Sequence, residues 1–196
     1  MNHRCGWVTE DPLYIEYHDQ EWGVPVFDDR KLFEFLILES FQAGLSWLTI
    51  LKKRRNFTKS FSHFNPKKVA QYSKKQFDEL MANAGIIRNR LKIEAAINNS
   101  RQFLNIQEEF GSFSNYSWEF VDKQPIQNRW KNLKQVPATT KESDAFSMDL
   151  KKRGFKFMGS TVVYAHMQAV GMVNDHTINC FRYKEVTKIS RKNQQK

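Results

Sequence analysis

The sequence predicts a single all-α domain, and three observations support this fold class. Apolar residues recur at helical spacing along most of the 196 residues, helix-capping signals bound these runs, and alternation typical of strands is almost absent. A chain of this length corresponds to about one domain. We find no internal repeat and no low-complexity linker, so we expect one helical domain over residues 1–183, followed by a basic tail over 184–196.

The first predicted helix covers residues 31–42, KLFEFLILESFQ, where the nearly continuous apolar run indicates burial. The Ala-Gly-Leu segment at 43–45 interrupts it, and Gly44 can adopt the left-handed conformation that ends helices. Ser46 can then accept a hydrogen bond as the N-cap of a second helix, which we expect to reach Arg55.

The middle of the chain contains two helices joined by a short hinge. Ser73 and Gln76 form a capping box, and Gly85 is expected to end the helix that follows. The next helix begins near Arg90. A helix N-terminus with free backbone N–H groups and neighbouring arginines, here Arg88 and Arg90, is a phosphate site. An ordinary αα-hairpin with solvated arginines is the alternative.

Three further helices are predicted towards the C-terminus: 113–122, 141–153 and 160–173. The second ends in Lys-Lys-Arg before Gly154, which suits the negative end of the helix dipole. Residues 123–139 contain two prolines and form the longest loop candidate, and residues 155–158 are the only stretch that resembles a strand.

The composition points to an acidic partner. Lys and Arg number 31 against 21 Asp and Glu, which gives a net charge of +10, and residues 184–196 supply less than half of that excess. A body this basic favours nucleic acid. No apolar run of membrane-spanning length and no N-terminal signal sequence is present, and two cysteines are too few for a disulfide scaffold. We therefore expect a cytoplasmic, monomeric protein that does not enter membranes.

Two groups of residues suggest a site. Two cysteines and two histidines, a set that suits tetrahedral zinc, lie in pairs near the two ends of the chain, and on a helix the second pair would lie one turn apart: Cys5, His18, His176 and Cys180. Buried free cysteines and hydrogen-bonded histidines are the alternative. The other group centres on Glu39 inside the apolar helix, where a charge is costly unless it faces a polar cavity. A surface glutamate and core aromatics are the alternative for this residue and for the rings that flank it: Trp7, Tyr14, Tyr17, Trp22 and Trp47.

Several ordered segments resemble the bacterial DNA-3-methyladenine glycosylase I family of helix-hairpin-helix DNA glycosylases. They span residues 4–180 and comprise Arg4-Cys-Gly-Trp-Val, Asp11-Pro-Leu-Tyr-Ile, Tyr17-His-Asp-x-Glu-Trp-Gly-Val-Pro, Glu39-x-x-Gln-Ala-Gly-Leu-Ser-Trp, Ala84-Gly-Ile-Ile-Arg, Lys151-Lys-Arg-Gly-Phe-Lys-Phe-x-Gly and Asn174-Asp-His-x-x-x-Cys. The resemblance implies a helix-hairpin-helix glycosylase fold, with two helical lobes around a base pocket and the termini tied by zinc. It also implies excision of 3-methyladenine from alkylated double-stranded DNA, with the free base as product. A non-catalytic, zinc-stapled DNA-binding module is the alternative function.

The resemblance assigns roles to the residues already singled out. It implies one structural zinc on Cys5, His18, His176 and Cys180. It implies a base pocket with Glu39 as the catalytic residue and Tyr17, Trp47, Trp7, Tyr14 and Trp22 as its lining. It implies DNA contacts at Gly44, Leu45, Gly85, Ile86, Ile87 and Arg88. Two features depart from the wider superfamily: Ile87 replaces a second hairpin glycine, and no Asp occurs between Asp78 and Asp122. We therefore expect neither its Asp mechanism nor its lyase activity.

Overall fold

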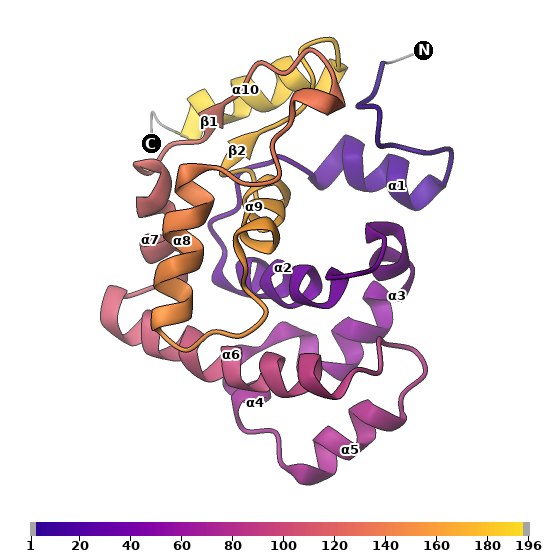
Figure 1. Cartoon of the computed structure of the whole chain (residues 1–196), viewed down its shortest axis with the longest axis vertical. Helices are drawn as coiled ribbons and strands as arrows, with labels where there is room; N and C mark the ends of the chain where they lie inside the picture. The colour runs from indigo at the N-terminus through magenta and orange to yellow at the C-terminus, as the bar shows by residue number, and fades with distance from the viewer. Residues whose placement is uncertain (1–2, 194–196) are drawn as a thin grey trace.

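The computed structural model describes residues 3–193 and is mostly helical, as the sequence predicts (Figure 1). The helices are α1 (Pro12–Glu16), α2 (Asp29–Gln42), α3 (Trp47–Ser60), α4 (Pro66–Ala70), α5 (Lys74–Ala82), α6 (Arg90–Phe110), α7 (Phe113–Trp118), α8 (Lys141–Lys152), α9 (Ser160–Ala169) and α10 (Phe181–Asn193). A π-helical turn, η1 (Tyr17–Glu21), follows α1, and two short strands, β1 (Ile126–Gln127) and β2 (Val173–Asn174), pair in parallel. Within this described part, no helix combines the length and apolar character needed to cross a bilayer.

Helix α2 lies at the centre of the molecule, between the α3–α6 group on one side and α8–α10 on the other (Figure 1). Asp28 begins it by accepting a hydrogen bond from the Lys31 backbone N–H. Nine of its residues are buried, and it packs against α3, α6, α7 and α9. Because this helix is surrounded by protein on most faces, its single buried carboxylate, Glu39, lies in the interior of the molecule.

The local signals before and after α2 are confirmed. Gly44 has a φ of 80°, the left-handed conformation expected at the end of the helix. Ser46 caps α3 by accepting a hydrogen bond from the Thr49 N–H at 3.2 Å. Helix α3 then continues to Ser60, beyond the predicted end at Arg55. The loop between α2 and α3 leaves Leu45 exposed at the surface.

The hairpin between α5 and α6 is built as the sequence predicts, with one shift. The capping box of Ser73 and Gln76 is present, but α5 ends at Ala82, three residues before Gly85. Asn83 Oδ1 accepts a hydrogen bond from the Gly85 N–H at 2.7 Å, which forms the turn. A Cβ on Gly85 would lie 2.9 Å from the side chains of Asn56 and Asn83, so only glycine lets the turn pack this closely on α3.

Two helix ends predicted in the C-terminal half are wrong. The helix over 113–122 ends at Trp118 and passes into a 3-10 turn, and the one from Ser160 ends at Ala169 instead of residue 173. Gly171 accounts for the second end, because a Cβ there would lie 2.4 Å from Pro25 N and its φ is 70°. Residues 155–158 form no strand, and residues 176–180 form turns instead of a helix.

The basic segment predicted to be a tail is largely helical. Residues 184–193 continue α10, so the expected boundary after residue 183 falls inside this helix; residues 194–196 lie outside the described part. Val186 is fully buried, which explains why the segment packs instead of extending into solvent. The Phe181 N–H donates to the His3 carbonyl at 3.0 Å, so α10 is joined to the N-terminal segment.

Candidate functional site

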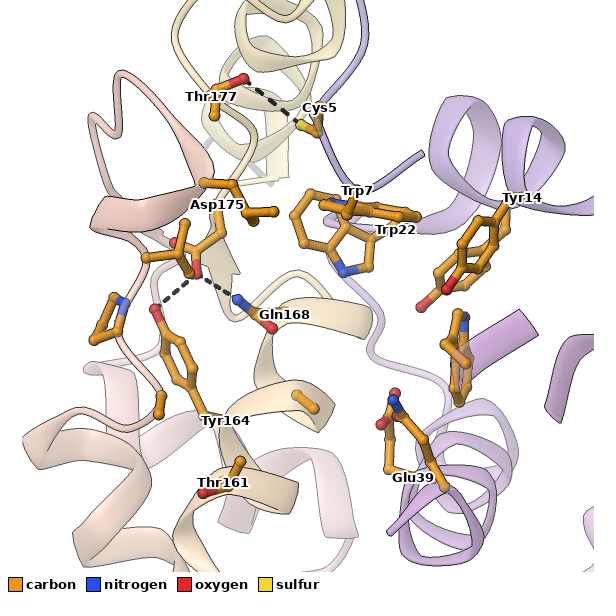
Figure 2. Close-up of a pocket in the computed structure, with 18 residues that line it drawn as sticks. Cys5, Trp7, Tyr14, Trp22, Glu39, Thr161, Tyr164, Gln168, Asp175 and Thr177 are labelled. Carbon is orange, nitrogen blue, oxygen red and sulfur yellow. Dashed lines mark hydrogen bonds between the residues drawn. The ribbon is translucent and has the colours of Figure 1, made fainter. Parts of the chain in front are cut away.

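A cavity of about 360 Å³ lies between α2, α9 and the N-terminal segment (Figure 2). All six residues expected to form a base pocket line this cavity, although they come from five separate parts of the chain: Trp7, Tyr14, Tyr17, Trp22, Glu39 and Trp47. The sequence shows only that these residues lie within one stretch of the chain. The fold places their side chains around a common cavity.

Aromatic rings form one wall of the cavity. Trp7 packs edge-on against Trp22 at 5.0 Å between ring centroids and against Tyr14 at 5.3 Å. Tyr17 lies 5.3 Å from Trp47 in the same measure. The indole N–H groups of Trp7 and Trp47 are buried without a hydrogen-bond partner. Since a buried N–H without a partner is costly, both are donors available to a ligand.

Glu39 projects from α2 into the cavity, opposite α9 (Figure 2). Its exposed fraction is 4%, and burial raises the pKa of its carboxyl to about 8. Among the described residues, no donor bonds to this carboxylate and no cation pairs with it. Burial, together with the Glu39 charge, also raises the pKa of the Tyr17 hydroxyl. An unpaired acid beside aromatic faces is suited to a flat ligand that carries positive charge or hydrogen-bond donors.

The opposite wall was not predicted from the sequence. Helix α9 presents Thr161, Tyr164, Ala165 and Gln168, and the loop of residues 133–138 closes the rim. Asp175 ties these parts together by accepting hydrogen bonds at 2.7 to 2.8 Å from four side chains: Asn128, Trp130, Tyr164 and Gln168. These four α9 residues follow the spacing i, i+3, i+4, i+7, which places them on one face of the helix. That spacing is the sequence signal that could have indicated a second wall of the cavity.

The four predicted metal ligands meet at one buried point. The ligand atoms of Cys5, His18, His176 and Cys180 all lie within 4.8 Å of one another. His18 Nε2 lies 3.4 Å from Cys180 Sγ, and His176 Nδ1 lies 3.5 Å from Cys5 Sγ. The side chain of Cys5 is the main cause that lowers the pKa of the Cys180 thiol, which favours the thiolate that binds metals.

The surroundings of these histidines fit a metal site. His18 Nδ1 donates to Asp19 Oδ1 at 2.7 Å, and Arg4 holds that carboxylate in turn. His176 Nε2 donates to the Trp22 carbonyl at 3.0 Å. Both rings therefore direct their unprotonated nitrogen towards the two sulfurs, which is the arrangement in which histidine binds a metal. A set of two sulfurs and two nitrogens is typical of structural zinc.

The candidate DNA contacts lie in two segments, the loop after α2 and the hairpin between α5 and α6, and most of them are at least partly exposed. Gly44 and Leu45 are exposed in the loop after α2, and Arg88 is exposed in the hairpin, with Ile87 half-buried. Ile86 is only 2% exposed, so its side chain packs in the core and only its backbone can face a ligand. Lys53 Nζ donates to the Ala84 carbonyl at 2.9 Å and fastens α3 to the hairpin.

Known proteins are similar to this chain in sequence and architecture. The family model described as methyladenine glycosylase matches residues 7–183. The protein named DNA-3-methyladenine glycosylase 1 from Escherichia coli (strain K12) is 51% identical over 180 residues, which cover 92% of this chain and 96% of that protein. The DNA-3-methyladenine glycosylase of Haemophilus influenzae is 47% identical over 180 residues, with 92% and 97% covered.

Solved structures agree with the sequence comparison. A crystal structure of 3-methyladenine DNA glycosylase I superposes with a TM-score of 0.89 at 50% identity, covering 91% of this chain and 98% of the other. The Staphylococcus aureus 3-methyladenine DNA glycosylase I, a structure that concerns recognition of 3-methyladenine, has a TM-score of 0.88 at 38% identity, covering 91% and 95%.

Proposed function

This chain belongs to the methyladenine glycosylase family, and we propose that it excises 3-methyladenine from alkylated DNA by hydrolysing the N-glycosidic bond. The observation that carries the proposal is the cavity in which a buried, unpaired Glu39 faces aromatic rings. Relatives at about half identity carry this activity in their names. The activity is that of a DNA repair hydrolase.

The chemistry of the lesion explains how so few polar groups suffice. 3-Methyladenine in DNA is cationic. When the bond between its N9 and the sugar C1′ breaks, the base keeps the electron pair of that bond and leaves as a neutral molecule. A water molecule forms the new bond at C1′ and releases its proton to solvent. Strong general-acid assistance is therefore not required, in keeping with the absence of the superfamily's Asp between Asp78 and Asp122.

We assign the recognition of the base to the cavity residues. The nucleotide must be extruded from the duplex, which is least costly for a damaged base. Glu39 accepts hydrogen bonds from the adenine edge and complements its charge, Trp47 stacks on the ring, and Tyr17 adds a polar contact. Trp7, Tyr14 and Trp22 complete the aromatic wall.

The enzyme is proposed to be monofunctional, without lyase activity. A lyase step needs an amine that attacks the sugar carbon as a Schiff-base nucleophile. In the described part of the chain, no lysine lines the cavity. Hydrolysis by water is therefore the reaction that the cavity residues support.

DNA is proposed to bind across the loop and the hairpin. Gly44 and Leu45 enter the gap left by the extruded nucleotide, since Leu45 is an exposed apolar side chain at a loop tip. The N–H groups of Gly85 and Ile86 donate to Asn83 and shape the turn. We propose that the hairpin presents this turn to a phosphate, with the Ile87 N–H and the cation of Arg88 as donors, and so acts as the helix-hairpin-helix element. The net charge of +10 supports binding to DNA. We propose that the protein binds it as a monomer, in the cytoplasm at the nucleoid.

Zinc is proposed to bind Cys5, His18, His176 and Cys180, one ion per chain. When bound, the ion supplies a tetrahedral crosslink between the two ends of the chain and no chemistry at the base. The residues around it connect it to the cavity, because Trp22 packs on His176 with ring centroids 4.7 Å apart. Cys5 and Thr177 also line the cavity wall.

The test is release of free base from methylated duplex DNA by the purified protein, followed by chromatography. We expect 3-methyladenine in the soluble fraction and no covalent adduct after borohydride reduction. The alternative, a non-catalytic zinc-stapled DNA-binding module, would bind the same duplex without releasing base. That module leaves Glu39 and its aromatic neighbours without a role, and the named activities of the relatives do not support it.

A further inference from the structure

A buried lysine joins the loop after α2 to the first turn of α6. Lys92 is 6% exposed, and its Nζ donates to the Phe41 carbonyl at 2.8 Å and to the Ala43 carbonyl at 2.6 Å. Both carbonyls belong to the C-terminal end of α2, where a helix leaves its last carbonyl groups without partners in the helix. The ammonium therefore satisfies acceptors that would otherwise be left unpaired.

This contact is more specific than simple packing. Placing an ammonium in the interior is costly, and burial lowers the pKa of Lys92. Within residues 3–193, no carboxylate forms an ion pair with it. The compensation comes from the two carbonyl oxygens and from the negative end of the α2 dipole. Because a lysine in this environment depends on those oxygens, it fixes where the end of α2 lies relative to α6.

The position of the link matters because of what lies on each side of it. Ala43 immediately precedes Gly44 and Leu45, the loop proposed to enter the duplex. On the other side, Asn89 caps α6 by accepting a hydrogen bond from the Lys92 backbone N–H at 3.1 Å, directly after Arg88. One residue therefore contacts the base of the loop with its side chain and the end of the hairpin with its backbone.

We propose that Lys92 is a positioning residue that couples the Gly44–Leu45 loop to the hairpin, so that phosphate binding by the hairpin places the loop for extrusion of the damaged nucleotide. The inference rests on the proposed function, because it takes the loop and the hairpin as DNA contacts. Lys92 itself touches neither the base nor the sugar: it does not line the cavity, and both acceptors of its ammonium are backbone oxygens. Its role therefore differs from that of a Schiff-base lysine.

The test combines Lys92→Met with Leu45→Ala in a double-mutant cycle. Lys92→Met keeps the length of the apolar stem and removes the donors. We expect it to lower kcat/KM for a methylated duplex by about tenfold, as loss of a charge-assisted hydrogen bond would. It should also weaken the fluorescence increase of a 2-aminopurine placed beside the lesion, while calorimetric affinity for free 3-methyladenine stays as in the wild type. Lys151→Met, which removes one exposed cation at the end of α8, is the matched control for charge and should leave all three measurements unchanged.

The cycle decides whether Lys92 acts through the loop. Residues coupled through a shared segment of backbone are expected to have non-additive effects, so Leu45→Ala should cost about tenfold in kcat/KM in the wild type and less than about twofold in Lys92→Met. If the two effects multiply instead, or if free-base affinity falls with Lys92→Met, the coupling is refuted. Should Lys92→Met fail to fold, Lys92→Arg keeps the cation and its donors, and Leu45→Ala must then cost as much in that background as in the wild type. A wild-type protein that releases no base would refute the proposed function instead.

Discussion

Replacing Glu39 by glutamine removes an ionisable carboxyl group from the cavity while keeping the size of the side chain. In the folded protein the pKa of Glu39 is about 8 because of burial, against an ordinary value of 4.5. A raised pKa means that the folded state is favoured below pH 4.5 and loses that advantage as the pH rises to 8. At about 1.4 kcal/mol per unit, the buried carboxylate lowers the free energy of unfolding by about 3 kcal/mol at pH 7. Glu39→Gln should therefore raise the free energy of unfolding at pH 7 by the same amount, about 3 kcal/mol.

The same substitution should impair catalysis. Glutamine presents a donor towards the adenine amino group in place of an acceptor, and a buried mismatch of this kind costs about 1 to 3 kcal/mol, or about tenfold to a hundredfold in excision rate. The ionised carboxylate is the form that complements the cationic base, so wild-type kcat/KM should rise with pH towards 8. Glu39→Gln should lose this rise.

The assays are single-turnover excision from methylated duplex across pH 5.5 to 9, calorimetric titration with free 3-methyladenine, and thermal melts under the same conditions. Glu108→Gln, which removes an exposed carboxylate on α6 outside the cavity, is the matched control and should behave as the wild type. If Glu39→Gln binds the free base as tightly as the wild type and keeps its pH profile, the carboxylate has only a structural role and our assignment of the base site is wrong.

Three other substitutions test the metal, DNA and core assignments. Cys180→Ser should lower the zinc content from about one ion per chain, measured by metal analysis, and reduce the melting temperature. It should also weaken binding of the free base, because His176 holds the carbonyl of Trp22, which lines the cavity. Unchanged base affinity in the folded variant would show that the metal group does not support the cavity. Arg88→Ala should weaken binding to damaged and undamaged duplex equally and reduce its salt dependence in fluorescence anisotropy, whereas a loss confined to damaged DNA would exclude a phosphate contact. Burial lowers the pKa of His166 to about 3, so the wild type should lose stability as the pH falls below 6.5. In denaturant titrations below pH 6.5, the free energy of unfolding of His166→Phe should rise relative to that of the wild type by about 1.4 kcal/mol per pH unit. A difference between the two proteins that does not change with pH would contradict this.

Features that depend on a few neighbouring residues were predictable from the sequence. Ser46 and Ser73 act as caps because a short polar side chain can only reach a backbone N–H two or three residues ahead. Burial of α2 followed from its nearly continuous apolar run. The residues of the aromatic wall and the metal group were identified from residue type and from the family resemblance, and the fold brings each group together.

Features that depend on contacts between distant segments were not predictable. Strands β1 and β2 have two residues each, too few for any periodicity to mark them, and they exist because residues 126–127 meet 173–174 in space. The end of α9 is set by the approach of Pro25 to Gly171, which no local pattern records. The spacing of His176 and Cys180 fits one helical turn, yet these residues lie in turns, because four ligand atoms can converge without a helix.

The two buried carboxylates of the cavity show how the fold separates structure from function. Asp175 is 2% exposed and accepts four hydrogen bonds, so its charge is fully used to hold the loop before α8 against α9. Glu39 is almost as buried, yet within the described residues it receives no hydrogen bond, and its pKa rises to about 8. If Glu39 were structural, it would be expected to have partners like those of Asp175, because an unpaired buried carboxylate is destabilising. The fold tolerates that destabilisation at a position lined by stacking surfaces and free indole donors, which is the arrangement of a site whose missing partner is the ligand.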